Sequence, residues 1–155
     1  MKPCLRVTLL FPSQPPLLVR TSPTIVLLRV EGLAVLLLSL MLYAQHGLGW
    51  LLFALLLLVP DLSMTGYLAG SRWGALSYNL FHTYTAPLLL AAAGLSLQHP
   101  TLTAVALIWS AHIGLDRMLG YGLKLPSGFK DTHLSVQSDP APHESVLPQP
   151  RVEIA

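Results

Sequence analysis

Two histidines and two aspartates lie within otherwise apolar stretches of this 155-residue chain. His112 and Asp116 are four residues apart, so a helix would present both on one face. Asp61 follows Pro60 directly, and His82 lies in the next apolar stretch. Imidazole nitrogens and carboxylate oxygens are ligands for first-row transition metals. The four residues are therefore candidate ligands for one divalent metal ion (Zn, Mn or Fe), and a proton relay or a purely structural hydrogen-bond and ion-pair network is open as an alternative.

Other polar residues in the same stretches could assist this site. Glu31 is the candidate catalytic residue, because a carboxylate beside a metal-bound water can act as a general base. Four further residues are predicted as supporting polar groups: Arg29, Asn79, Arg117 and His133. His133 lies beyond the last apolar stretch and is expected to fold back over the site.

The composition predicts that these residues are embedded in a membrane protein. Hydrophobic residues make up 53% of the chain and charged residues only 10%, whereas soluble domains carry about 25% charged residues. Cys4 is the only cysteine, which excludes disulfide frameworks, cysteine-rich zinc sites and iron–sulfur clusters. Because basic residues do not cluster, we expect no nucleic-acid partner.

The apolar stretches predict an all-α fold with four membrane-spanning helices. The run 50–59 would be only about 15 Å long as a helix, so this helix must continue through Pro60 and Asp61 to cross a bilayer. The predicted spans are about 24–44, 49–68, 74–97 and 101–121. Gly66, Gly70 and Gly74, at four-residue spacing, would permit close helix packing.

The positions of the basic residues predict the orientation of these spans. Lys and Arg occur before or early in the first span, at Arg72 between the second and third, and after the fourth. The positive-inside rule therefore places both termini in the cytoplasm. The acidic and histidine side chains then lie within roughly 13 Å of the cytoplasmic ends of their helices. At that depth a charged group is costly unless it is paired, so we expect these groups to face one another.

The two ends of the chain differ from the middle in composition. Residues 1–23 contain five prolines and predict an irregular leader, and 24–134 forms the four-helix membrane domain. Residues 135–155 are rich in polar residues and proline and predict a disordered tail.

Several sequence strings resemble an uncharacterised bacterial integral membrane family, domain of unknown function 4260, over about 26–135. These strings are Leu28-Arg29-Val30-Glu31-Gly32-Leu33, Pro60-Asp61-Leu62-Ser63-Met64, Tyr78-Asn79-Leu80-Phe81-His82-Thr83-Tyr84, Ala111-His112-Ile113-Gly114-Leu115-Asp116-Arg117, Gly120-Tyr121-Gly122-Leu123-Lys124 and Phe129-Lys130-Asp131-Thr132-His133-Leu134. The resemblance implies a multi-pass protein of the bacterial inner membrane with four helices, and it supplies no activity.

The chain is also similar to bacterial inner-membrane proteins classed as metal-dependent hydrolases. These proteins pair a Pro-Asp at a helix end with histidines in neighbouring spans, as this chain does with Pro60-Asp61. They continue with a further Asp and His, where this sequence has Leu62-Ser63-Met64.

Three classes of function stay open. The cluster could bind a metal, with hydrolysis of a lipid-like substrate as the enzymatic alternative. It could bind a cation or proton in a transporter. It could also only order the bundle through ion pairs such as Arg117–Asp116 and Arg29–Glu31. The lipid bilayer is the expected partner, and a homo-oligomer is a further candidate assembly.

Overall fold

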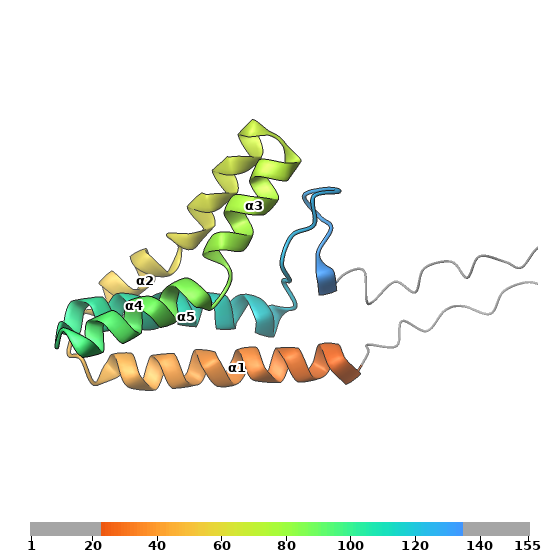
Figure 1. The fold of residues 1–155 in the computed structure, drawn as a ribbon. Coiled ribbons are helices and arrows are strands. Elements are labelled where there is room, and N and C mark those ends of the chain that lie inside the picture. Colours follow the sequence, from red (N-terminus) through yellow and green to blue (C-terminus); the bar gives the residue numbers. More distant parts are fainter. Residues whose placement is uncertain (1–22, 135–155) are drawn as a thin grey trace, which may run out of the picture.

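The computed structural model describes residues 23–134, which form five α-helices and one 3₁₀ helix (Figure 1). In chain order these are α1 Pro23–Ala44, α2 Trp50–Leu57, the 3₁₀ helix η1 Pro60–Ala69, α3 Ser71–Phe81, α4 Thr85–Ser96 and α5 Pro100–Leu119. The all-helical prediction is confirmed for this part of the chain. Residues 1–22 of the predicted leader (1–23) and the whole predicted tail (135–155) lie outside the described residues.

Three helical segments are long and apolar enough to cross a membrane: Pro23–Ala44, Trp50–Ala69 and Pro100–Leu119. They match the predicted first, second and fourth spans within two residues. Many large apolar side chains on them are exposed, including Leu51 and Leu58 at 74% and 63% of their surface. An outer surface of this kind fits contact with lipid rather than water.

The predicted third span, 74–97, is not one continuous helix. It divides into α3 and α4, with a break at 82–84. Pro87 explains the break, because it has no N–H for the Thr83 carbonyl and its ring would collide with that carbonyl in a continuous helix. The two pieces have 11 and 12 residues, so each is about 16–18 Å long and too short to cross alone.

The second segment also changes direction, at Leu58 and Val59. Pro60 lacks an N–H, and the chain continues from it as the narrower 3₁₀ helix η1. η1 and α3 pack together as a hairpin that leans away from the other helices (Figure 1). Gly70, with φ of 108°, makes the turn between them.

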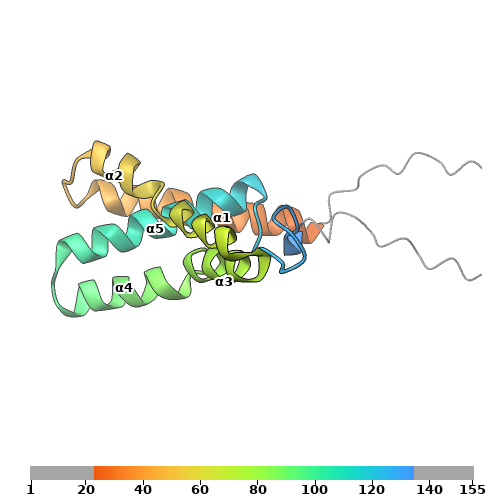
Figure 2. The ribbon, with the colours of Figure 1, turned by 90° about the horizontal axis from the view of Figure 1, so that it is seen from above.

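α1 and α5 form the main helix pair, and both α2 and α4 pack on α5 (Figure 2). α1 and α5 approach most closely at Gly32 and Gly114. A Cβ on Gly114 would lie 2.8 Å from the Gly32 carbonyl oxygen and 2.9 Å from the Leu36 nitrogen. The hydrophobic core lies farther along the two helices, where Tyr43 of α1, Phe53 of α2 and Ile108 of α5 pack together.

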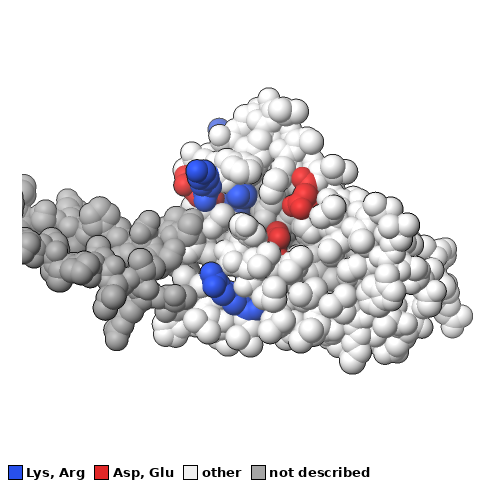
Figure 3. Space-filling model, turned by 180° about the vertical axis from the view of Figure 1, so that it is seen from behind, with Lys and Arg blue, Asp and Glu red and all other residues white. Residues whose placement is uncertain are grey.

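The charged side chains of residues 23–134 are confined to one part of the molecule. None lies in 32–60 or 73–115. Figure 3 shows the charges in the middle of the molecule and toward the end where α1 begins, and no charge toward the opposite end on the face that it displays. The first turns of α1 and the last described segment, drawn in blue, both lie toward that charged end (Figure 1).

The close α1–α5 crossing can be tested by substitution. Gly114→Val should destabilise the protein by about 1–3 kcal/mol, because the new side chain would overlap the backbone of α1. Gly49→Val is the matched control, since a Cβ at Gly49 meets nothing within 4 Å. Thermal unfolding in detergent measures both. Equal melting temperatures for the two variants would contradict this packing.

Candidate metal centre

Asp61, His82, His112 and Asp116 lie together where the two bent segments meet α5. Asp61 is in the first turn of η1, and His82 is the first residue after α3. His112 and Asp116 are one turn apart on α5. Both bends therefore occur at the level of the cluster. His82 and His112 are buried, whereas the Asp61 side chain is 42% exposed.

The polar atoms of the cluster face one another at short distances. The two Nε2 atoms of His82 and His112 are 3.1 Å apart. Asp61 Oδ1 is 3.5 Å from His82 Nε2 and 3.7 Å from His112 Nε2. Asp116 Oδ2 is 3.6 and 3.8 Å from the same two nitrogens. The structure thus brings together all four residues that the sequence predicts as metal ligands.

These distances suit a tetrahedral metal ion. Zinc binds His nitrogen and carboxylate oxygen at about 2.0–2.2 Å, so neighbouring ligand atoms in a tetrahedron are about 3.3–3.6 Å apart. The ligand atoms of Asp61, His82 and His112 all lie within 4.8 Å of one another, and their three separations are 3.1, 3.5 and 3.7 Å. Only small side-chain movements are needed to close the set around one ion.

Tyr78 holds His82 in the orientation that a metal ligand requires. The His82 Nδ1 lies 2.8 Å from the Tyr78 carbonyl oxygen, which can only accept a hydrogen bond, so Nδ1 carries the proton. In the neutral ring, Nε2 then presents its lone pair to the cluster. The Tyr78 ring also stacks on His82 at 3.6 Å, and its hydroxyl donates to Asp116 Oδ2 at 3.1 Å. Tyr78 is 2% exposed, so these contacts are shielded from the surroundings of the protein.

Arg117 stabilises the break after α3 rather than pairing with Asp116. Its guanidinium donates to the His82 carbonyl at 3.2 Å and to the Tyr121 carbonyl at 2.9 Å. The break at 82–84 leaves carbonyls without helical partners, and Arg117 supplies a charged donor to one of them. Within residues 23–134, neither an Arg117–Asp116 nor an Arg29–Glu31 ion pair is present.

Glu31 and Arg29 lie on α1, away from the four-residue cluster. Glu31 is exposed, shares a surface hollow with Tyr84 and Arg117, and makes no ion pair or hydrogen bond within the described residues. Arg29 is exposed, with its guanidinium against Gly120. Neither residue touches the cluster, so the role of Glu31 as a general base stays a prediction.

Asn79 fixes the segment after α5 instead of touching the cluster. Its Nδ2 donates to the Lys124 carbonyl at 2.9 Å, and its Oδ1 accepts from the Lys124 N–H at 2.8 Å. His133 closes the same segment, because its Nδ1 accepts from the Leu123 N–H at 2.8 Å. Burial lowers the pKa of His133, and the nearby Arg117 charge lowers it further.

Lys124 links this segment to Tyr78. Its Nζ donates to the Phe129 carbonyl at 2.7 Å and lies 4.4 Å from the Phe129 ring centre and 5.4 Å from that of Tyr78. Burial lowers the pKa of Lys124, and the Asp116 carboxylate opposes this effect. The site residues predicted from the sequence include neither Tyr78 nor Lys124. The four-residue spacing of Tyr78 and His82 was the one available signal for Tyr78.

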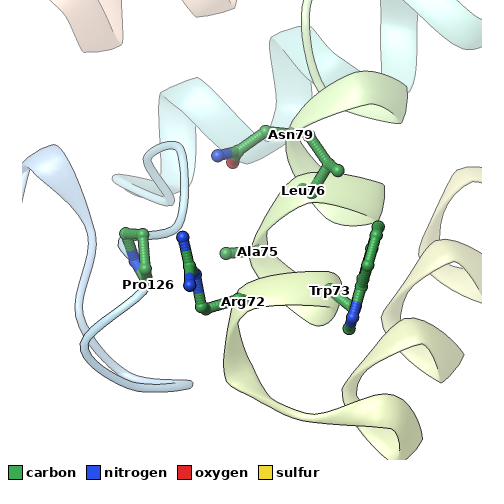
Figure 4. A pocket seen from close by; sticks show the side chains of 6 residues that line it. All are labelled: Arg72, Trp73, Ala75, Leu76, Asn79 and Pro126. Atoms are coloured by element: carbon green, nitrogen blue, oxygen red, sulfur yellow. The ribbon is translucent and has the colours of Figure 1, made fainter.

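A surface hollow of about 530 Å³ lies between α3 and the same segment. Figure 4 shows Arg72 extending toward Pro126, while Trp73 points to the other side of α3, and Asn79 lies farther along the helix. None of the four cluster residues lines this hollow, so the hollow is separate from the cluster.

The paired hydrogen bonds of Asn79 should control the order of the segment after α5. Asn79→Ala removes the two side-chain hydrogen bonds to the Lys124 backbone, and we expect a loss of about 1–3 kcal/mol in local stability. Amide hydrogen exchange at Lys124 and Leu125 should become faster. Thr83→Ala is the control, because the Thr83 hydroxyl makes only a local contact with the Leu80 carbonyl. Unchanged exchange in Asn79→Ala would show that these bonds do not hold the segment.

Comparison with known proteins identifies a family but no characterised relative. No curated protein and no solved structure matches this chain. One family model, described as a domain of unknown function (DUF4260), matches residues 25–136. This match includes all four residues of the cluster and the segment that Asn79 holds. The chain therefore belongs to the DUF4260 family.

Proposed function

We propose that this protein binds one divalent transition-metal ion inside the membrane, with Asp61, His82 and His112 as ligands. The observation that carries the proposal is the pair of buried imidazoles whose Nε2 atoms lie 3.1 Å apart beside a carboxylate. The Tyr78 carbonyl supports the tautomer of His82 that leaves Nε2 free to bind. Two nitrogen and one or two oxygen ligands suit Zn, Mn and Fe.

The proposal places the protein in the bacterial inner membrane with the bilayer as its partner. We propose four crossings, in which α2 and η1 form the second and α3 and α4 form the bent third. An even number of crossings agrees with the start of α1 and the last described segment lying toward the same end (Figure 1). The basic residues Arg72, Lys124 and Lys130 favour a cytoplasmic position for that end. Homo-oligomer formation stays a prediction.

Metal content should depend on the two buried histidines. We expect His82→Ala and His112→Ala each to reduce bound metal from about one equivalent to less than a tenth, because each removes one of three ligands. Plasma mass spectrometry of protein purified in detergent, after equilibration with Zn, Mn or Fe, measures this. His46→Ala is the matched control, since His46 lies in the α1–α2 turn. Equal metal in all variants, or none in the wild type, would refute the site.

Hydrolysis of a lipid-like substrate is the second candidate function. The 42% exposure of Asp61 favours it, because an open side admits water and substrate. Catalytic zinc sites have three protein ligands and a water, whose pKa the metal lowers to about 7. Asp116, oriented by the Tyr78 hydroxyl, would then accept the proton of that water. In a closed structural site Asp116 would be the fourth ligand instead.

Asp116→Asn separates these two roles. For the hydrolase we expect the variant to retain its metal and to lose about 10²–10⁴-fold in turnover of an amphiphilic ester, because the proton acceptor is gone. Metal analysis and ester hydrolysis are measured on the same preparation, with Asp131→Asn as the control outside the cluster. Loss of metal from Asp116→Asn would instead make Asp116 a ligand. If wild-type protein is loaded with metal but does not hydrolyse such esters, the hydrolase function is refuted.

A transporter is less consistent with the distribution of charge. Residues 32–60 and 73–115 contain no charged side chain, so no charged residue leads from the cluster to the opposite end. Figure 3 shows that end as uncharged on the face it displays. A cation would therefore meet an unfavourable apolar region on the far side of the site.

A further inference from the structure

An apolar pocket of about 160 Å³ lies next to the metal centre, between the bend at Val59 and Pro60, the end of α3 and the middle of α5. No charged side chain lines it. The only polar atom of a lining side chain, the Trp109 indole nitrogen, donates to the Phe81 carbonyl at 2.7 Å. The Trp109 and Phe81 rings also stack, with centres 5.6 Å apart. The pocket is therefore nonpolar, and one of its walls is held by hydrogen bonding and ring stacking.

Each wall of the pocket continues directly into a residue of the cluster. Pro60 precedes Asp61, and Phe81 precedes His82. On α5, Ile108 lies one helical turn before His112 and on the same face. A molecule that occupies the pocket consequently has one end beside the metal ligands.

The order of pocket and cluster along α5 matches that of an amphiphile in a membrane. α5 ends at Leu119 and is followed by the segment that contains Lys124, so this end of the helix is near the membrane surface. Val105, on the pocket wall, precedes His112 by seven residues and so lies about 10 Å deeper. Lipids of that leaflet likewise have their chains deeper than their head groups.

Acyl chains are also the molecules that this face of the protein would meet. Two side chains of the pocket wall are themselves exposed, Val59 at 45% and Phe81 at 39%. In a bilayer such side chains contact lipid tails. A dry apolar cavity of about 150 Å³ is large enough to bind benzene, so this pocket has room for a segment of one chain.

We propose that this pocket binds the acyl chain of an amphiphile from the adjacent leaflet and places its polar head group at Asp61, His82 and His112. The head-group part of the inference rests on the proposed metal site. Binding of the chain itself does not require the metal, so the two parts can fail separately.

Trp109 provides a direct test, because it lines the pocket. Replacing Trp50 and Trp73 by Phe leaves Trp109 as the only tryptophan. Titration with 12-bromododecanoate in detergent should then quench its fluorescence saturably, since bromine quenches on contact. Unbrominated dodecanoate should reverse the quenching. Val105→Phe fills the pocket and should abolish the saturable part, whereas Val26→Phe, at an exposed position of α1, should leave it unchanged.

The outcomes distinguish this inference from the metal proposal, because metal is measured on the same samples. Quenching that is not saturable, or that persists unchanged in Val105→Phe, overturns the pocket whether or not metal is bound. Failure of dodecanoate to compete overturns it as well, independently of any variant. If the protein binds no metal but its fluorescence is quenched saturably and dodecanoate reverses the quenching, the acyl-chain pocket is supported. The missing metal then refutes only the metal site.

Discussion

The high free-energy cost of polar groups in an apolar bundle is the constraint on which this structure depends. Charged groups at membrane depth must pair, bind a metal or reach water. Here two imidazoles and two carboxylates from three chain segments meet. Each imidazole Nε2 lies 3.1–3.8 Å from the other Nε2 and from one oxygen of each carboxylate. Any rearrangement that separated them would leave polar atoms unsatisfied in an apolar environment.

The two helix breaks follow from the same constraint. Pro60 and Pro87 interrupt helical hydrogen bonding, and the resulting bends occur beside Asp61 and His82. Backbone groups freed at a break need new partners, and Arg117 supplies one for the His82 carbonyl. The breaks thus bring Asp61 and His82 beside α5 at one level, while the hairpin of η1 and α3 leans away from the other helices. The adjacent apolar pocket lies at this level too, since its walls are the residues next to the bends.

The support around the cluster is built in layers outward from the imidazoles. Tyr78 fixes the His82 ring through stacking and a carbonyl and also donates to Asp116. Lys124 lies over Tyr78, and Asn79 holds the backbone of Lys124 through two hydrogen bonds. Ligand positions in metal sites depend on such outer contacts as much as on the ligands. The segment after α5 therefore helps to position the residues of the cluster.

The sequence alone determined the apolar helices and the polar residues that interrupt them, because burial of charge restricts both composition and pairing. Three of the predicted spans and the meeting of Asp61, His82, His112 and Asp116 were accessible in this way. Only the tertiary structure decided that 74–97 is broken, that Tyr78 orients His82 and that Arg117 binds carbonyls instead of Asp116. Spacing along a helix shows which side chains share a face. Hydrogen-bond partners depend instead on how bent segments pack against one another, and residue periodicity does not predict that packing.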